Sequence, residues 1–316
     1  MFKVDLTQLP VAPSLHWLEA FGLHLRRTPT SKRRERSQLT LDAYLRDVRL
    51  FAGYFEQVNG LEFTPDQLNA TDLKNWLSQE IKPATYNRRL ASMRMLINWS
   101  RQVGVIDYDP AEWIPFMDAT RESPRDLSEV ERNALVDVAE NGSHLKSWNR
   151  FYQLRDLLLF RLLDGAGLRI SEAIECKRTD VHLDDGYIDV VGKGKKHRKV
   201  RIGGRLVEVI AAWLDLMPDS VEGTLVTDEH GHAIGRQAAW GRFVMMAETA
   251  GVNATPHACR HTFVYRFMDA VMNGDKGKLP AAIDAVCQQT GDRPEVILAY
   301  YTRARESDIR AAAEVM

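Results

Sequence analysis

With 316 residues, 45% hydrophobic and 27% charged, the chain has ordinary globular composition and is long enough for two domains. Its 42 Lys and Arg residues are balanced by 43 Asp and Glu residues, so the net charge of −1 argues against a uniformly basic nucleic-acid coat. Basic faces can still form locally where the signs segregate. The most apolar segment, 157–163, is interrupted by Arg161 and is too short to span a bilayer. We therefore expect no membrane partner.

The cysteines indicate the compartment. Cys176, Cys259 and Cys287 are odd in number and form no Cys-x-x-Cys pair. This usage is typical of a reducing environment and predicts no disulfide framework. The first residues also lack a charged segment followed by an apolar run, so they do not resemble a signal peptide. We expect a cytoplasmic protein.

The first part of the chain predicts about four amphipathic helices. A short helix covers 14–25, and a second is expected to begin at an N-cap on Thr40 and to carry apolar residues at helical spacing. A third follows Thr71, and a fourth runs from near Thr85 to a point before Gly104. Together they predict an all-helical domain over residues 1–117, followed by a linker at 118–127.

This helical domain is expected to have a cationic side. Its fourth helix buries an apolar stripe while it presents Arg88, Arg89 and Arg94 elsewhere. Residues 26–37 are also dense in cations, although a charge run of this kind is equally typical of a solvated face. The three arginines are our candidates for a DNA-binding surface.

Residues 128–316 predict a second domain that is mixed in structure. Ser128 and Glu131 have the spacing of a capping box, and segment 149–164 is apolar nearly all round, as in a buried central helix. Ser171 is expected to cap the next helix. Two strand-like segments, 187–191 and 197–202, flank a glycine-bearing turn and predict a hairpin. Further helices are expected, so the fold class is mainly α with a small β-hairpin or sheet.

The most informative stretch is 256–303. Within it, His257, Arg260 and His261 have helical spacings that place them on one face. Two His residues four apart would suit zinc, but the permanent cation of Arg260 would oppose a bound metal. An anion, by contrast, would accept hydrogen bonds from Arg260 and His257. The fragment alone leaves open the alternative that these His residues belong to a core and that the Arg is solvated.

Two further cations and a phenol extend this pattern. Arg169 lies where a buried helix ends and a new helix begins, a place where backbone amides favour anions. Lys193 lies on the glycine-flanked turn of the predicted hairpin, and Tyr301 lies near the end of the stretch. Taken singly, each has a structural alternative: Arg169 can pair with Glu172, and Lys193 can be an exposed turn residue. As a set, they fit attack of a phenol on a phosphodiester.

Four segments in this order resemble the tyrosine recombinase (phage integrase) family. They are GAGLRISE around Arg169, GKGKKHRKV around Lys193, HACRH from His257, and AYYT around Tyr301. LTLDAYLRDVRLF and ATYNRRLASMRMLINWSRQVGVIDYDPA are similar to the core-binding domain of that family. The resemblance covers the chain from about Leu15 onward. It implies a simple two-domain recombinase with a SAM-like core-binding domain at 1–117 and a catalytic domain at 128–316.

The resemblance also implies an activity. Members of the family cut and rejoin double-stranded DNA at a specific recombination site through a covalent 3′-phosphotyrosine, with no metal, ATP or other cofactor, in integration, transposition or resolution of a mobile element or replicon. It implies that Tyr301 is the nucleophile, that Arg169 and Arg260 hold the phosphate, and that His257 bonds the same phosphate and takes the phenol proton. Lys193 would protonate the leaving 5′-oxygen. Tyr300 competes with Tyr301, but the spacing to Asp292 favours Tyr301.

One position departs from the family. Nine residues before Tyr301, where the family usually has His or Trp, this chain has Asp292. An ionised Asp cannot donate a hydrogen bond to a phosphate and would repel it. Either Arg293 or a water supplies the missing contact, or the chain is a non-catalytic or weakly active DNA-binding accessory protein of the same fold. A relaxing topoisomerase, which shares the chemistry but not the expected tetramer, is a further alternative.

The last residues indicate assembly. Ile309, Ala312, Ala313 and Met316 form one apolar stripe on a short helix that needs a groove to bury it. Docking on its own domain is one possibility. In the family that the chain resembles, a terminal helix docks on the neighbouring subunit, which implies a homotetramer on DNA.

Overall fold

The computed structural model describes residues 16–29, 35–79, 81–118, 126–192, 196–217 and 223–302. The chain divides into two compact units, Met1–Arg121 and Glu122–Met316. This division falls within the expected linker, most of which lies outside the described residues. Lys193 and the expected terminal helix also lie outside them. Within the described part of the chain, no helix is both long enough and apolar enough to cross a bilayer.

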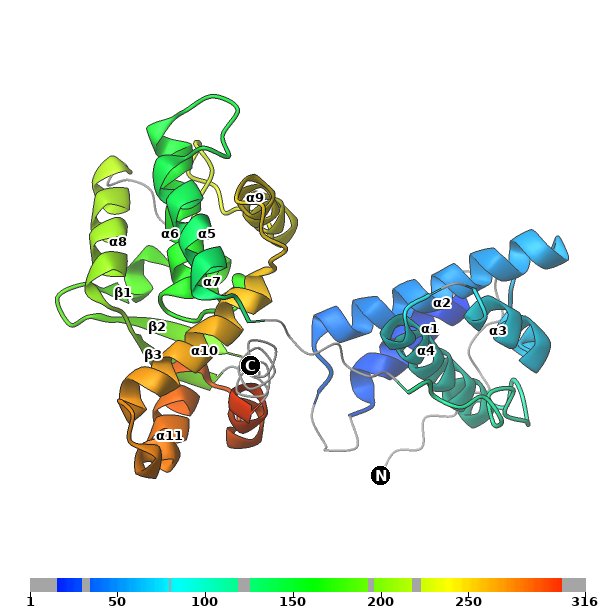
Figure 1. Ribbon diagram of the computed structural model, residues 1–316. Coiled ribbons are helices and arrows are strands. Elements are labelled where there is room, and N and C mark those ends of the chain that lie inside the picture. The colour runs from blue at the N-terminus through cyan, green and yellow to red at the C-terminus, as the bar shows by residue number, and fades with distance from the viewer. Residues whose placement is uncertain are drawn as a thin grey trace. The chain divides into compact units, whose positions relative to one another are not determined.

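The first unit contains the four helices that the sequence predicts (Figure 1). They are α1 (His16–Arg27), α2 (Gln38–Asn59), α3 (Ala70–Leu77) and α4 (Pro83–Gln102), with a short 3₁₀ turn at Pro65–Gln67. The start of α2 differs from the prediction, because Ser37 and not Thr40 is its N-cap. The Ser37 side chain accepts a hydrogen bond from the Thr40 amide, so the helix begins about a turn earlier.

An aromatic core holds these helices together. The Phe51 ring on α2 packs edge-on against Phe63, with centroids 5.1 Å apart, and against Trp76 on α3, at 5.4 Å. Edge-to-face pairs of this kind contribute about 0.5–1.5 kcal/mol each beyond the area that they bury. The core therefore forms from the apolar faces of the predicted helices, which leaves their polar faces outside.

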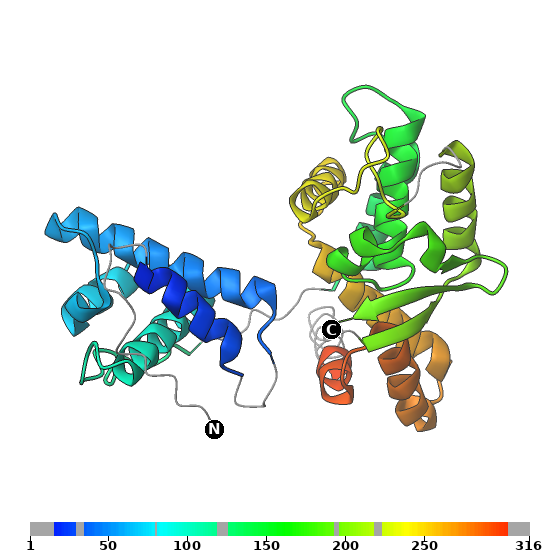
Figure 2. The ribbon, with the colours of Figure 1, turned by 180° about the vertical axis from the view of Figure 1, so that it is seen from behind.

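The second unit is mostly helical, and its elements pack around one buried helix (Figures 1 and 2). Its helices are α5 (Glu129–Asn141), α6 (Arg150–Asp164), α7 (Ile170–Glu175), α8 (Gly204–Leu216), α9 (Arg236–Thr249), α10 (Pro256–Met272) and α11 (Leu279–Thr290). Two 3₁₀ turns lie at Arg178–Asp180 and Lys276–Lys278, and a last helix covers 294–302. As predicted from its apolar sequence, α6 is the buried central helix, and α5, α8, α9 and α10 pack against it.

A small antiparallel sheet completes this unit. Its strands are β1 (Val181–His182), β2 (Tyr187–Gly192) and β3 (Lys196–Arg201), in that order. The hairpin of β2 and β3 confirms the predicted one, and its register pairs Tyr187 with Arg201 and Gly192 with Lys196. The sequence did not predict β1, which is too short for an alternating pattern. Because α11 packs against β3, the hairpin lies beside the end of α11 (Figure 2).

Two helix starts in this unit matter for the site. Ser128 and Glu131 form the predicted capping box of α5. The predicted cap of α7 was wrong: Arg169, not Ser171, is the N-cap residue. The Glu172 carboxylate accepts a hydrogen bond from the Arg169 amide at 2.9 Å, so α7 begins at Ile170 and Ser171 lies inside it.

Candidate active site

Three separate segments bring charged side chains together at the sheet side of α10. The link from α6 to α7 carries Arg169, the first turns of α10 carry Arg260, and the link that follows α11 carries Asp292. The first link passes very close to α10 at Gly167, which has φ +67° and whose added Cβ would lie 2.3 Å from Phe263. Only glycine accepts both that backbone conformation and that contact. The glycine-bearing segment GAGLR therefore positions Arg169 beside Arg260.

Arg260 is a buried cation, with its side chain only 1% exposed. It donates to the carbonyl oxygens of Gly167 and, at 2.7 Å, Thr290, and to Asp292 Oδ2 at 2.7 Å. Burial lowers the pKa of Arg260, while Asp292 opposes that change, and a guanidinium remains charged in either case. A buried charge is costly unless it is paired, and Asp292 supplies that pairing. Together the bonds to Asp292 and to the two carbonyl oxygens hold the guanidinium in one orientation.

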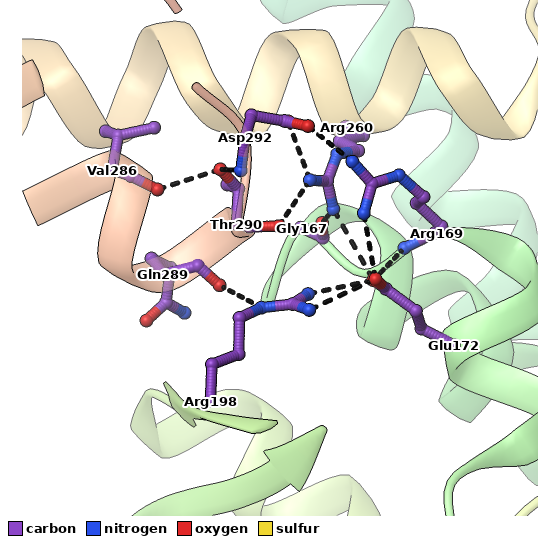
Figure 3. A network of polar contacts seen from close by, with 9 residues as sticks. All are labelled: Gly167, Arg169, Glu172, Arg198, Arg260, Val286, Gln289, Thr290 and Asp292. Carbon is purple, nitrogen blue, oxygen red and sulfur yellow. Dashed lines mark hydrogen bonds and ion pairs between the residues drawn. The ribbon is translucent and has the colours of Figure 1, made fainter. Parts of the chain in front are cut away.

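Arg169 reaches the same carboxylate from a more open position (Figure 3). Its Nη2 donates to Asp292 Oδ1, and its Nη1 donates to Glu172 Oε1 at 2.9 Å. The structural alternative for Arg169, a pair with Glu172, is thus present together with the bond to Asp292. Since Arg169 and Arg260 each take one oxygen of Asp292, they form a two-armed site for a planar or tetrahedral anion.

Glu172 is the shared counter-ion beneath this site. It accepts from Arg169 and from both ends of the Arg198 fork, at 3.1 and 2.8 Å, and its Oε2 lies 3.6 Å from Arg260 Nη1. Burial alone would raise the pKa of Glu172. Hydrogen bonds and charge from Arg198, with the Arg169 amide and Arg260, instead hold that pKa below its ordinary value. Glu172 is therefore ionised and fixes three guanidinium groups.

Sequence reasoning missed Arg198 because it lies within a run of basic residues in the hairpin. Its Nε donates to the Gln289 carbonyl at 3.0 Å, at the end of α11. The Gln289 side chain in turn accepts from the Arg201 amide at 2.9 Å and donates to the Arg201 carbonyl at 2.7 Å. These bonds fasten β3, the strand that follows residues 193–195 in the chain, to α11.

His257 lies at the exposed start of α10, one turn before Arg260. Its ring centroid is 4.3 Å from that of His261. Partial desolvation lowers the pKa of His257. The positive charges of Arg260 and Arg169 lower this pKa further, whereas the negative charge of Asp292 raises it. The neutral imidazole is therefore favoured near neutral pH, and it can accept a proton.

The structure places Tyr301 away from the two arginines. Its ring stacks on Tyr265 with centroids 6.1 Å apart, and its hydroxyl donates to Met272 Sδ at 3.9 Å. Met272 ends α10, and about 18 Å of helix axis separates it from Arg260 at 1.5 Å per residue. The neighbouring Tyr300 packs on His261 instead, with centroids 4.0 Å apart. The roles expected for Lys193, His257 and Tyr301 stay predictions.

The arginines expected to contact DNA all have contacts within the first unit. Arg88 pairs with the buried Asp47. The Arg89 guanidinium lies over the Trp76 ring at 4.7 Å. Arg94 donates to the Ile114 carbonyl at 2.9 Å and lies over the Phe116 ring at 4.6 Å. Each is half-buried and contributes to packing, and its contact with DNA stays a prediction.

Both units of the chain are similar in sequence to known proteins. Residues 125–276 match the sequence profile of the phage integrase family, and residues 30–104 match that of the phage integrase N-terminal SAM-like domain. Tyrosine recombinase XerC of Xanthomonas campestris pv. campestris (strain B100) is 30% identical over 243 residues, which cover 75% of this chain and 72% of that protein. Tyrosine recombinase XerD of Listeria monocytogenes serotype 4b (strain F2365) is 27% identical over 242 residues, 73% and 79% of the two chains.

Solved structures share the fold at lower identity. XerH recombinase in a post-cleavage complex with a palindromic difH substrate has a TM-score of 0.66 and 16% identity, over 94% of both chains. A lambda integrase dimer bound to a core site has a TM-score of 0.65 and 14% identity, over 91% of this chain and 77% of that one.

The SAM-like helical unit and the mixed unit that follows it define the class of enzymes that cut and rejoin DNA at specific sites. Within that class, the chain belongs to the tyrosine recombinase (phage integrase) family. The resemblance seen in the sequence is confirmed.

Proposed function

We propose that this protein cuts and rejoins double-stranded DNA at its own recombination site through a 3′-phosphotyrosine on Tyr301. The observation that carries the proposal is the convergence of Arg169 and Arg260 on the two oxygens of one anion, Asp292. A phosphodiester likewise offers two non-bridging oxygens to two guanidinium groups. Two fixed cations at that place stabilise the charge that grows on phosphorus during attack.

The remaining roles follow from the chemistry. The Tyr301 oxygen forms a bond to phosphorus, the bond from phosphorus to the 5′-oxygen breaks, and the phenol proton passes to the neutral His257 ring. Lys193 gives a proton to the leaving 5′-oxygen, which becomes a free hydroxyl. The energy of the broken bond is kept in the phosphotyrosine, so the strand can be rejoined without ATP, metal or another cofactor. Tyr301 must first move from Met272 to the arginines.

We further propose a division of labour between the parts of the chain. Residues 1–117 would bind DNA as the core-binding domain, with Arg88, Arg89 and Arg94 near phosphates, and residues 128–316 would carry the chemistry. A homotetramer on DNA is supported by a structural relative: the lambda integrase tetramer bound to a Holliday junction, with a TM-score of 0.63 and 15% identity over 89% of this chain and 78% of that one. Activity on DNA together with free cysteines supports a cytoplasmic location.

Covalent trapping tests the proposal. A binding selection from random duplexes with the Tyr301→Phe protein first defines a bound sequence. A nicked copy of that duplex then loses a short 5′-hydroxyl fragment on cleavage, so the wild-type protein accumulates as a covalent adduct. We expect the adduct with wild type and with Tyr300→Phe, and none with Tyr301→Phe. The attachment point is mapped by mass spectrometry of the tryptic peptide.

The alternative, a non-catalytic DNA-binding accessory protein, is favoured by one observation: the Asp292 carboxylate already lies between the two arginines. The same assay separates the two functions. Tight binding of the selected duplex with no adduct would favour the accessory role, and an adduct on Tyr300 would refute the nucleophile that we assign.

A further inference from the structure

Asp292 makes the contacts expected of a phosphate. Its Oδ1 accepts from Arg169, and its Oδ2 accepts from Arg260 at 2.7 Å (Figure 3). The carboxylate is 11% exposed, so it reaches the edge of the protein interior at the more exposed Arg169. The Asp292 carboxylate therefore occupies the place between Arg169 and Arg260 where a phosphate would bind.

The local charge supports this assignment. Three guanidinium groups, those of Arg169, Arg198 and Arg260, face two carboxylates, those of Glu172 and Asp292. Glu172 accepts hydrogen bonds from Arg198 and Arg169, whereas the two carboxylate oxygens of Asp292 accept from Arg169 and Arg260. An incoming phosphodiester would therefore meet Asp292 at contact distance, where two like charges repel.

The chain around Asp292 allows it to leave. Asp292 follows Gly291, which ends α11 with φ +70°, and precedes the helix of residues 294–302. Its backbone amide is held by Thr290 Oγ1 at 3.3 Å, a long hydrogen bond. It thus lies on a three-residue link between two helices and can change position without unfolding either of them.

We propose that Asp292 is a positioning residue that competes with the scissile phosphate: it holds Arg169 and Arg260 in place while DNA is absent, and the phosphate displaces it. This inference rests on the proposed function and adds regulation to the same site. Because only Arg293 separates Asp292 from the helix with Tyr301, displacement of the carboxylate also releases the start of that helix. Arrival of the phosphate is thereby coupled to movement of the nucleophile.

Binding of inorganic phosphate tests the competition without DNA. The full-length protein is titrated with phosphate at constant ionic strength, and the backbone amide NMR signals of residues 167–172 and 256–262 report the dissociation constant. In Asp292→Asn, which keeps the size of the side chain and removes its charge, we expect phosphate to bind at least about tenfold more tightly than in wild type.

Two control variants separate competition from other effects. Asp292→Glu keeps the charge and should bind phosphate within about threefold of wild type. Asp284→Asn makes the same change in net charge on the exposed face of α11, where Asp284 accepts from Gln288, and should behave as wild type. If Asp292→Asn does not fold, Asp292→His is measured against the same threshold, because it too removes the negative charge.

Phosphate affinity in Asp292→Asn no higher than in wild type would overturn the proposal, and so would an equal gain in Asp284→Asn. The result does not depend on DNA cleavage. Tighter phosphate binding in a protein that never forms a DNA adduct would sink the proposed function and leave the competition standing. An adduct together with unchanged phosphate binding would support the proposed function and overturn the competition between Asp292 and phosphate.

Discussion

Asp292 and Arg260 form a largely buried ion pair, with 2.7 Å between the carboxylate Oδ2 and the guanidinium Nη2 and with side chains 11% and 1% exposed. From the sequence, Asp292 is a residue that repels a phosphate. In the structure, it is also the residue that pairs with both Arg169 and Arg260. Removal of one partner from a buried pair costs about 3–5 kcal/mol, because the other charge is left uncompensated. A bound phosphate can supply that compensation in its place.

Asp292→His should therefore increase cleavage. The change removes a competing anion and supplies a hydrogen-bond donor, so we expect single-turnover formation of the covalent adduct to rise by about tenfold. The measurement uses the nicked duplex at saturating protein, with Asp284→Asn as the control for net charge. A strong loss of cleavage would show that Asp292 is needed in the reacting complex itself.

Arg169→Ala should lower the rate of DNA cleavage. Arg169 is 36% exposed and bonds two carboxylates, so its loss should disturb folding less than loss of the buried Arg260. We expect the rate of adduct formation to fall by about 10²-fold or more, as for removal of a preorganised donor, while binding of the duplex is retained. Single-turnover cleavage near the wild-type rate would exclude Arg169 from the phosphate site.

Glu172→Gln should reveal a dependence of stability on pH. Since the pKa of Glu172 is lower in the folded chain than its ordinary value of 4.5, its ionised form stabilises the fold. That contribution is complete above about pH 4.5 and is lost as the pH falls through the lower, folded pKa. At pH 7 we expect Glu172→Gln to lose about 3–5 kcal/mol of unfolding free energy.

Denaturant unfolding of wild type and Glu172→Gln across pH 3–8 measures this contribution. The difference between the two proteins should be constant from pH 6 to 8 and should shrink below about pH 4.5. A difference that does not change with pH would mean that packing, and not the charge of Glu172, accounts for it.

The sequence predicted the parts of this protein that depend on local patterns. The all-round apolar character of segment 149–164 and the strand-like composition of segments 187–191 and 197–202 each identify an element without knowledge of its neighbours. The resemblance of the segments around Arg169 and Arg260 to the tyrosine recombinase family implied that these residues would gather, and both contact Asp292.

What the sequence did not predict depends on long-range packing. Arg198 pairs with Glu172 because the hairpin of β2 and β3 packs against α7, and Arg88 pairs with Asp47 because α2 packs against α4. Asp292 was recognised as unusual, but its bonds to Arg169 and Arg260 follow from the meeting of three segments that are far apart in sequence. The contact of the Tyr301 hydroxyl with Met272 also joins residues that are far apart in sequence, and no local pattern indicates it.

Deletion of residues 306–316 should test assembly. These residues lie outside the described part of the chain, and their apolar stripe predicts a helix that needs a groove. If that helix docks on a neighbouring subunit, the truncated protein should bind one half-site with unchanged affinity and should lose about tenfold in the cooperativity of binding two. Gel-shift titration on one and on two half-sites measures both quantities. Unchanged cooperativity would show that the segment does not link subunits.

His257 offers a direct probe of the electrostatics of the site. Its pKa lies below the ordinary value of 6.5 because desolvation disfavours the imidazolium and because Arg260 and Arg169 repel it, while Asp292 attracts it. Arg169→Gln removes a repelling charge and should raise the pKa of His257, whereas Asp292→Asn removes an attracting charge and should lower it. The C2 proton of His257, followed by NMR from pH 5 to 8, reports each midpoint, and Asp284→Asn should leave it unchanged. Shifts of one sign in both variants would mean that a change in structure, and not the charges around His257, sets its protonation.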